Sequence, residues 1–180
     1  MALPVVPRKF AVPRAHQINR APSPTIAISL PWLLVMLGSL SPTWPVIASF
    51  PLLPPIGFLF LVAWLQMRPG LFPVWAGLPL GLFDDLYSGQ PFGCGVLLWS
   101  LTAIALDYVE ARFPWRGFFQ NWLLAAATTA LYLCLAAFAA GGSIMQIGPQ
   151  VLLSILLYPL LGRIVGMIDR LRLLPFRSLA

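Results

Sequence analysis

The sequence predicts an all-α integral membrane protein with about six transmembrane helices. Of the 180 residues, 59% are hydrophobic and only 9% are charged, and the mean hydropathy is +0.87. One soluble core of this size cannot bury so many apolar side chains, so we expect lipid to surround them. The apolar residues also gather in six runs, and the connections between them that carry cationic residues alternate with connections that carry none. These observations together favour a helical, multi-pass protein of the cell inner (cytoplasmic) membrane.

The chain begins with a basic, proline-rich tail at residues 1–24. Its prolines prevent a continuous helix, and it carries Arg8, Lys9, Arg14 and Arg20. The first apolar run comes only after this tail and lacks a small-residue cleavage site at its end. We therefore expect that run to be retained as a membrane anchor and not removed as a signal peptide.

Six apolar runs form the predicted transmembrane domain, residues 25–168, and a basic C-terminal end follows at 169–180. The runs are 25–40, 52–67, 71–87, 92–109, 118–140 and 147–168. The first three would be about 24 to 26 Å long as helices, so each either spans a locally thin bilayer or is partly re-entrant. Prolines 51, 54 and 55 crowd the start of the second run. We place its helix start near Leu52, after an outer loop at 41–51.

The cations predict the orientation of the bundle. Ten of the eleven Lys and Arg residues lie in the two termini or in alternate connections, the eleventh, Arg163, lies toward the C-terminal end of the last run, and none lies in 41–51, 88–91 or 141–146. Short connections that carry Lys and Arg stay in the cytoplasm. Both termini should therefore be cytoplasmic, with an even number of crossings. The cations that follow the N-terminal tail are Arg68, Arg112, Arg116, Arg163, Arg170, Arg172 and Arg177.

The composition argues against several function classes. The net charge of +6 is spread between apolar runs and not gathered on one water-exposed face, which disfavours nucleic-acid binding. The two cysteines, Cys94 and Cys134, lie inside apolar runs, and the single histidine, His16, lies in the tail. No metal-ligand cluster or nucleophile with a basic partner emerges. We therefore expect no enzyme activity, no cofactor and no metal.

The chain has five acidic residues, of which two are placed unusually. Asp107, Glu110 and Asp169 fall at cytoplasmic helix ends near arginines, where solvated pairing is expected. Asp84 and Asp85 lie in the outer part of the third run, and adjacent helical residues point about 100° apart. We therefore expect at most one of the two to face the bundle interior. It would accept backbone hydrogen bonds from the Ser88–Gly89 turn, although a role in handling protons or substrate stays open.

Glycines predict a tight hairpin between the third and fourth runs. Three pairs are four residues apart: Gly77 and Gly81, Gly89 and Gly93, and Gly162 and Gly166. This small-residue spacing lets helices approach closely. Two of the pairs bracket Asp84 and Asp85, which favours close packing there, either internally or with a partner.

The segment 69–93 resembles the rod shape-determining protein MreD family. The family signature is a glycine, an aspartate four residues on, a Ser-Gly pair and a further glycine that opens the next helix. These positions read Gly81, Asp85, Ser88, Gly89 and Gly93. The resemblance selects Asp85, and not Asp84, as the inward carboxylate, and it marks these five residues as a structural or partner-binding motif.

The resemblance implies a non-catalytic scaffold subunit of the rod (elongation) complex. Such a subunit binds MreC directly and helps to couple MreB, the actin-like cytoskeletal filament, to peptidoglycan synthases, which maintains rod cell shape. The cytoplasmic arginines would then be available to anionic lipids or to the filament.

The family is also similar in fold to the substrate-binding subunits of vitamin-uptake (ECF-type) transporters. That likeness leaves an alternative open, a small-solute-binding membrane subunit of a transporter. Such a role needs polar groups that converge in a cavity near the membrane midplane. Besides the two aspartates, the polar residues considered for such a site are Thr128, Thr129 and Ser154, which lie well inside the runs.

Overall fold

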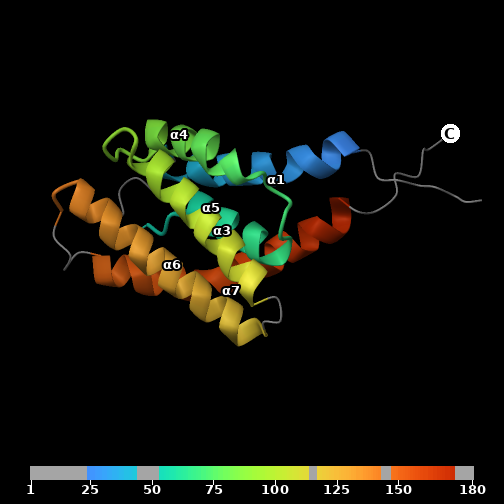
Figure 1. Ribbon diagram of the computed structural model, residues 1–180. Coiled ribbons are helices and arrows are strands. Elements are labelled where there is room, and N and C mark those ends of the chain that lie inside the picture. The colour runs from blue at the N-terminus through green and yellow to red at the C-terminus, as the bar shows by residue number, and fades with distance from the viewer. Residues whose placement is uncertain (1–23, 44–52, 114–116, 143–146, 173–180) are drawn as a thin grey trace, which may run out of the picture.

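The structure is a computed structural model, and it describes residues 24–43, 53–113, 117–142 and 147–172. Most of the predicted tail, most of the predicted outer loop and the last eight residues lie outside this part of the chain. All secondary structure in the described residues is helical, and each of the six predicted runs contains one α-helix (Figure 1). The elements are α1 (Pro24–Ser39), η1 (Ser41–Thr43), α3 (Ile56–Met67), η2 (Val74–Ala76), α4 (Gly77–Tyr87), α5 (Cys94–Arg112), α6 (Phe118–Ala139) and α7 (Ile147–Arg172).

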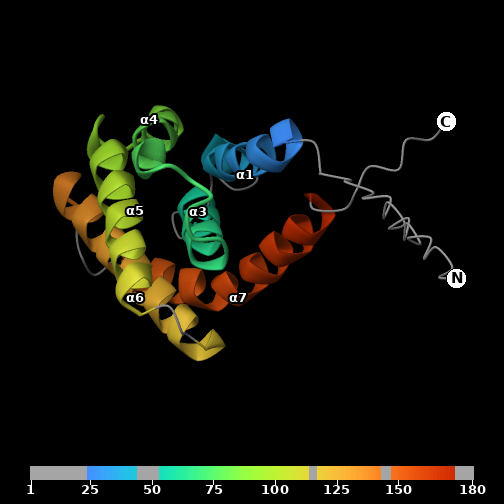
Figure 2. The ribbon, with the colours of Figure 1, turned by 45° about the vertical axis from the view of Figure 1, so that its right-hand side comes forward.

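Helix α3 is the core of the bundle. It contacts α1, α5, α6 and α7, and Figure 2 shows it in the centre of the molecule with the other helices around it. Every residue from Gly57 to Trp64 is buried. Its 12 residues extend only about 18 Å, which suits a buried core helix better than a lipid-facing span.

The second and third helices begin later than predicted. Helix α3 begins at Ile56 and not near Leu52, because a residue that precedes proline is disfavoured in the helical conformation and Pro54 and Pro55 are consecutive. Helix α4 begins at Gly77, after the 3-10 turn η2, and has 11 residues. The predicted run at 71–87 is therefore a turn followed by a helix of about 16 Å.

Three helices, α5, α6 and α7, are long and apolar enough to cross a membrane. Helix α1 has 16 residues and belongs with the shorter apolar helices. By length and composition, the described residues thus provide three candidate spans where six were predicted.

The bundle is apolar on its outside and partly polar within. The outer face of α7 exposes Leu152, Leu156 and Leu160 by 59%, 64% and 55%. Among the buried residues, in contrast, are Thr129 and Ser154, with three of the acids. Soluble proteins rarely expose such continuous apolar faces. This distribution suits a surface that lipid covers.

The described arginines gather at one end of the bundle, which we call the arginine end. Arg68 and Arg172 bind the same aspartate there, and Arg163 lines a cavity beside Gln66 and Phe118. Arg112 is the last residue of α5 and Arg170 lies in the last turn of α7. Figure 1 shows the C-terminal ends of both helices toward the same side of the bundle. The opposite end, which holds the α4–α5 turn, is called the hairpin end. Among the described residues, cations lie only toward the arginine end, in agreement with the one-sided pattern in the sequence.

Two prolines inside helices each leave one backbone carbonyl without its usual partner. Proline has no N–H to donate to the residue four before it, so Pro31 frees the carbonyl of Ala27 and Pro159 frees that of Ile155. Arg172 Nη1 donates to the Ala27 oxygen at 2.6 Å, and Trp122 Nε1 donates to the Ile155 oxygen at 3.1 Å. Both freed carbonyls are therefore satisfied by a side chain from another helix.

We expect Trp122→Phe to lower the free energy of unfolding by about 1 kcal/mol, because it leaves the Ile155 carbonyl unpaired. Denaturation of the purified protein in detergent, followed by circular dichroism, measures the change. Trp75→Phe is the matched control, since Trp75 is 63% exposed. Equal stability of the two variants would contradict this assignment.

Candidate functional site

The Asp85 carboxylate lies against the first turn of α5. Its Oδ2 accepts hydrogen bonds from the Gly93 and Val96 N–H groups at 2.8 and 3.3 Å, and its Oδ1 accepts one from Gly95 N–H at 2.7 Å. The first N–H groups of a helix lack partners within it and favour negative charge. Gly93, the N-cap residue, has no side chain to supply an acceptor. Asp85 therefore caps α5 from the preceding helix.

Helices α4 and α5 pack backbone against backbone. A methyl group added at Gly81 would lie 2.5 Å from the Gly95 carbonyl oxygen, and one at Gly77 would lie 2.5 Å from Ser100 Cα. A methyl group at Gly95 would meet Asp85 Oδ1, also at 2.5 Å. These distances are well inside van der Waals contact. Only glycine fits at the three positions unless the helices move apart.

The turn between α4 and α5 also requires glycine. Gly89 and Gly93 have φ angles of +70° and +94°, in the left-handed region that residues with a side chain rarely adopt. Ser88 ends α4 and donates its N–H to the Asp84 carbonyl oxygen at 2.8 Å. The five predicted motif residues thus belong to one compact unit, the α4–α5 hairpin. The donors to Asp85 come from the start of α5, however, and not from the Ser88–Gly89 turn as expected.

Both carboxylates of the aspartate pair are buried, so the expectation that at most one would face the interior is wrong. Asp84 is 7% exposed and Asp85 is 6% exposed. The reason is that α4 packs against α5 on one side and against α1 on another, and side chains about 100° apart reach different neighbours. Asp85 meets α5, whereas Asp84 faces a cavity that Ser39 and Tyr132 also line.

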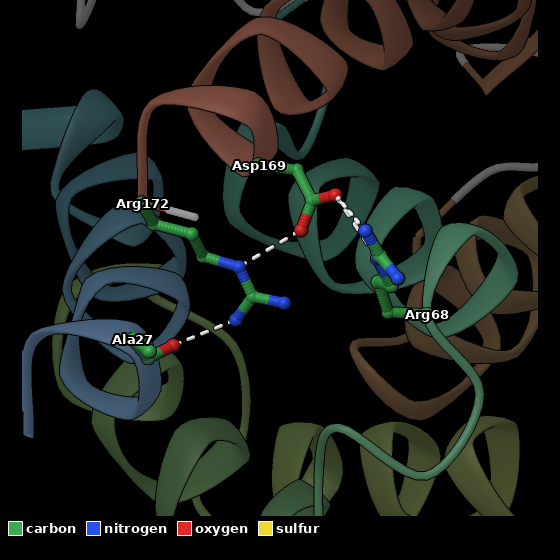
Figure 3. Close-up of polar contacts among 4 residues, drawn as sticks. All are labelled: Ala27, Arg68, Asp169 and Arg172. Atoms are coloured by element: carbon green, nitrogen blue, oxygen red, sulfur yellow. Dashed lines mark hydrogen bonds and ion pairs between the residues drawn. The ribbon is translucent and has the colours of Figure 1, made fainter. Parts of the chain in front are cut away.

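A second polar cluster lies at the arginine end, and we call it the Asp169 cluster (Figure 3). Asp169 Oδ2 accepts hydrogen bonds from Arg68 Nε and Nη2 at 3.0 and 2.8 Å, and Oδ1 accepts one from Arg172 Nε at 2.8 Å. Arg172 also reaches the Ala27 carbonyl, and its guanidinium lies 5.2 Å from the centre of the Trp64 ring. The cluster therefore joins α7 to α1, to α3 and to the turn after α3.

Asp169 is not the solvated helix-end acid that the sequence suggested. It is 5% exposed, because α7 continues past the predicted end at 168 to Arg172 and keeps this turn inside the bundle. The Arg172 side chain is 6% exposed, whereas that of Arg68 is 47% exposed. The hydrogen bond from Arg68 to Asp169 and the charge of Asp169 raise the pKa of Arg68, so its guanidinium stays charged. Asp107 is exposed as expected.

The other polar candidates from the sequence do not converge on one site. Thr128 Oγ1 and Ser154 Oγ donate within their own helices, to the Leu124 and Gln150 carbonyl oxygens at 2.9 and 2.7 Å. Thr129 is buried without a hydrogen bond to any described residue. These side chains do not form the central solute site that the transporter alternative needs.

The third glycine pair, at 162 and 166, makes no close helix contact. A methyl group at Gly162 would meet nothing within 4 Å among the described residues, and one at Gly166 would meet only the Met67 side chain at 3.5 Å. The glycine spacing alone did not distinguish this open pair from the close approach at Gly77 and Gly81. It also missed Gly95, which lies outside the three pairs.

Comparisons of the chain with protein-family models, with curated proteins and with solved structures gave no match.

We expect Gly81→Ala to destabilise the protein by roughly 1 to 3 kcal/mol, because the added methyl group overpacks the α4–α5 contact. Gly162→Ala should leave stability unchanged or slightly raised, because that position is open and alanine favours a helix. Thermal denaturation in detergent compares the two variants. A stability loss at Gly162 equal to that at Gly81 would contradict the packing described here.

We expect Asp169→Asn to cost roughly 3 kcal/mol, because it leaves the buried Arg172 guanidinium without its counter-charge. Asp107→Asn, at an exposed acid toward the same end, should change stability by less than about 0.5 kcal/mol. Chemical denaturation of both variants in the same detergent makes the comparison. If Asp169→Asn is as stable as Asp107→Asn, the cluster does not hold α7 in place.

Proposed function

We propose that this chain is a non-catalytic membrane scaffold subunit of the rod (elongation) complex, a member of the MreD family. In this role it binds MreC directly and helps to couple MreB to peptidoglycan synthases, directly or through other subunits. The observation that carries the proposal is the α4–α5 hairpin. The five residues that resemble the MreD signature make up a single unit whose backbone geometry depends on each of the three glycines and on Asp85.

The hairpin offers a rigid surface for a partner helix. Helix α4 exposes Leu78, Leu82 and Leu86 at a spacing of four residues, and side chains at this spacing line one face of a helix. On α5, Leu97 and Leu101 are also exposed. Because Asp85 and the glycines fix the two helices relative to each other, each set of exposed leucines is held in a fixed position. A membrane-spanning helix of MreC would pack against these leucines.

The proposed location is the cell inner membrane, with the arginine end and both termini in the cytoplasm. The apolar outer faces of α5, α6 and α7 support a location in a membrane. The one-sided arginines support the orientation. Exposed arginines such as Arg163 and Arg170 would meet the headgroups of anionic lipids or the filament. The six-span arrangement with an ECF-type fold belongs to the same proposal.

We expect depletion of the protein in a rod-shaped cell to give rounded cells. We also expect Asp85→Ala to reduce the MreC that co-purifies with the protein more strongly than Asp84→Ala does, because only Asp85 caps α5. Cell shape is measured by microscopy, and co-purification by quantitative immunoblotting at equal membrane levels of each variant.

A second matched pair of variants tests whether MreC is lost because the exposed leucines of the hairpin are changed and not because the protein is less stable. Leu82 on α4 and Leu153 on α7 are 38% and 41% exposed, so Leu82→Gln and Leu153→Gln carry a similar cost in lipid. Only Leu82→Gln should lose MreC. Normal rods after clean removal of the gene, or equal MreC recovery with every variant, would overturn the proposal.

A further inference from the structure

The hairpin end contains a polar cavity that the capping role of Asp85 does not use. Its volume is about 190 Å³. Residues from five α-helices, α1, α3, α4, α6 and α7, and from the α4–α5 turn converge on it, although they are far apart in the sequence. Its polar lining includes Ser39, Asp84, Ser88, Gln90, Tyr132 and Gln150.

Asp84 gives the cavity a negative charge. It is 7% exposed and contributes nothing to the cap of α5. The hydroxyl groups of Ser39 and Tyr132 lie beside its carboxylate. Among the described residues no cation lines the cavity. A buried carboxylate without a counter-charge is costly, and such groups inside membrane proteins mark ligand or ion sites.

Several oxygen atoms around Asp84 lack hydrogen-bond partners. Ser39 Oγ, Ser88 Oγ and Gln90 Oε1 are buried, and none has a partner in the part of the chain that the structure describes. Ser39 is 2% exposed as a residue. The Gln90 amide nitrogen donates to the Tyr132 hydroxyl at 3.3 Å, so the Gln90 amide oxygen is the atom of this side chain without a partner among the described residues. Buried polar groups in native proteins are almost always paired. The cavity therefore presents the Asp84 carboxylate together with three oxygens, those of Ser39, Ser88 and Gln90, that can accept further hydrogen bonds.

The walls of the cavity are themselves held in place. Gln150 Nε2 donates to the Leu53 carbonyl oxygen at 2.5 Å, which fastens α7 to the segment before α3. Gly57 lies directly against Ser39, because a methyl group there would overlap the Ser39 hydroxyl. The unpaired oxygens thus surround a space whose walls are fixed by packing.

We propose that this cavity binds a small primary ammonium ion. An ammonium group brings three N–H donors and a positive charge, which match the Asp84 carboxylate and the unpaired oxygens of Ser39, Ser88 and Gln90. The volume is below that of pockets for drug-sized ligands, so the ligand is small. A divalent metal is a poorer match, because the described residues hold no cluster of three metal-binding His, Cys, Asp or Glu side chains.

The ammonium group can come from a soluble amine or from the headgroup of phosphatidylethanolamine. Both present the same –NH₃⁺ group to Asp84, and ethanolamine reproduces the headgroup as a soluble molecule. This binding site does not depend on the scaffold function, because it requires neither MreC nor any other subunit.

The test uses the full-length protein, purified in detergent without phosphatidylethanolamine. Ethanolamine hydrochloride is titrated at pH 7 and constant ionic strength, and the melting temperature is followed by tryptophan fluorescence. The melting temperature should rise by several degrees and saturate, because a ligand that binds only the folded state stabilises it. Ethylene glycol, of similar size but neutral, should give no saturable shift. Choline, which is charged but has no N–H donors, should give a much weaker one.

Variants of the residues that line the cavity test the proposed contacts with the ammonium group. Asp84→Asn should lower the apparent affinity for ethanolamine at least tenfold, whereas Asp107→Asn, at an exposed acid far from the cavity, should bind as the unmodified protein does. If Asp84→Asn does not fold, Ser88→Ala serves in its place and should lower the affinity several-fold. A flat ethanolamine titration of the unmodified protein would overturn the proposal. So would equal shifts with ethylene glycol, or unchanged affinity in Asp84→Asn.

The two sources of the ammonium group are separated in lipid nanodiscs. If the lipid headgroup occupies the cavity, discs with phosphatidylethanolamine should raise the melting temperature above that in phosphatidylcholine discs and abolish the ethanolamine shift. If a soluble amine is the ligand, the shift should persist in both discs. Either result supports an ammonium site. The absence of an ethanolamine shift and of a difference between the discs would overturn it.

Discussion

The structure depends on one constraint, which is that backbone groups without a helical partner must find one inside the bundle. In a bilayer no water is available to them. Asp85 accepts from the free N–H groups at the start of α5, and Arg172 and Trp122 donate to the carbonyls that Pro31 and Pro159 release. Each of these side chains comes from a different helix than the group it satisfies. Satisfying the backbone therefore also fixes how the helices pack.

The same constraint connects the fold to the proposed function. The cap by Asp85 works only if α4 and α5 approach closely, and Gly81 and Gly95 permit that approach. A hairpin built in this way has little freedom to change shape, which suits a surface that a partner helix recognises. The Asp84 carboxylate, one residue earlier on α4, takes no part in the cap of α5. It can serve a ligand in the cavity while its neighbour holds the hairpin.

Much of the fold could be predicted from the sequence, because helix positions follow from local apolar runs and prolines. The composition likewise indicated lipid contact, and the one-sided arginines indicated which helix ends lie together. Contacts between distant residues could not be predicted in this way. Nothing local indicates that Arg68 binds Asp169, 101 residues further on, or that Asp84 meets Tyr132. The burial of both aspartates also depends on α4 having neighbours on two sides, which only the packing of the bundle decides.

The most direct test of the central claim, that Asp85 caps α5 across the hairpin, is hydrogen exchange at single amides. The protein in detergent micelles is transferred to deuterated buffer, and the Gly93, Gly95 and Val96 amides are followed by nuclear magnetic resonance. If Asp85 accepts from all three, they should exchange as slowly as amides in the middle of α5, although they stand at its start. Exchange as fast as that of the turn residue Gly89 would contradict the account.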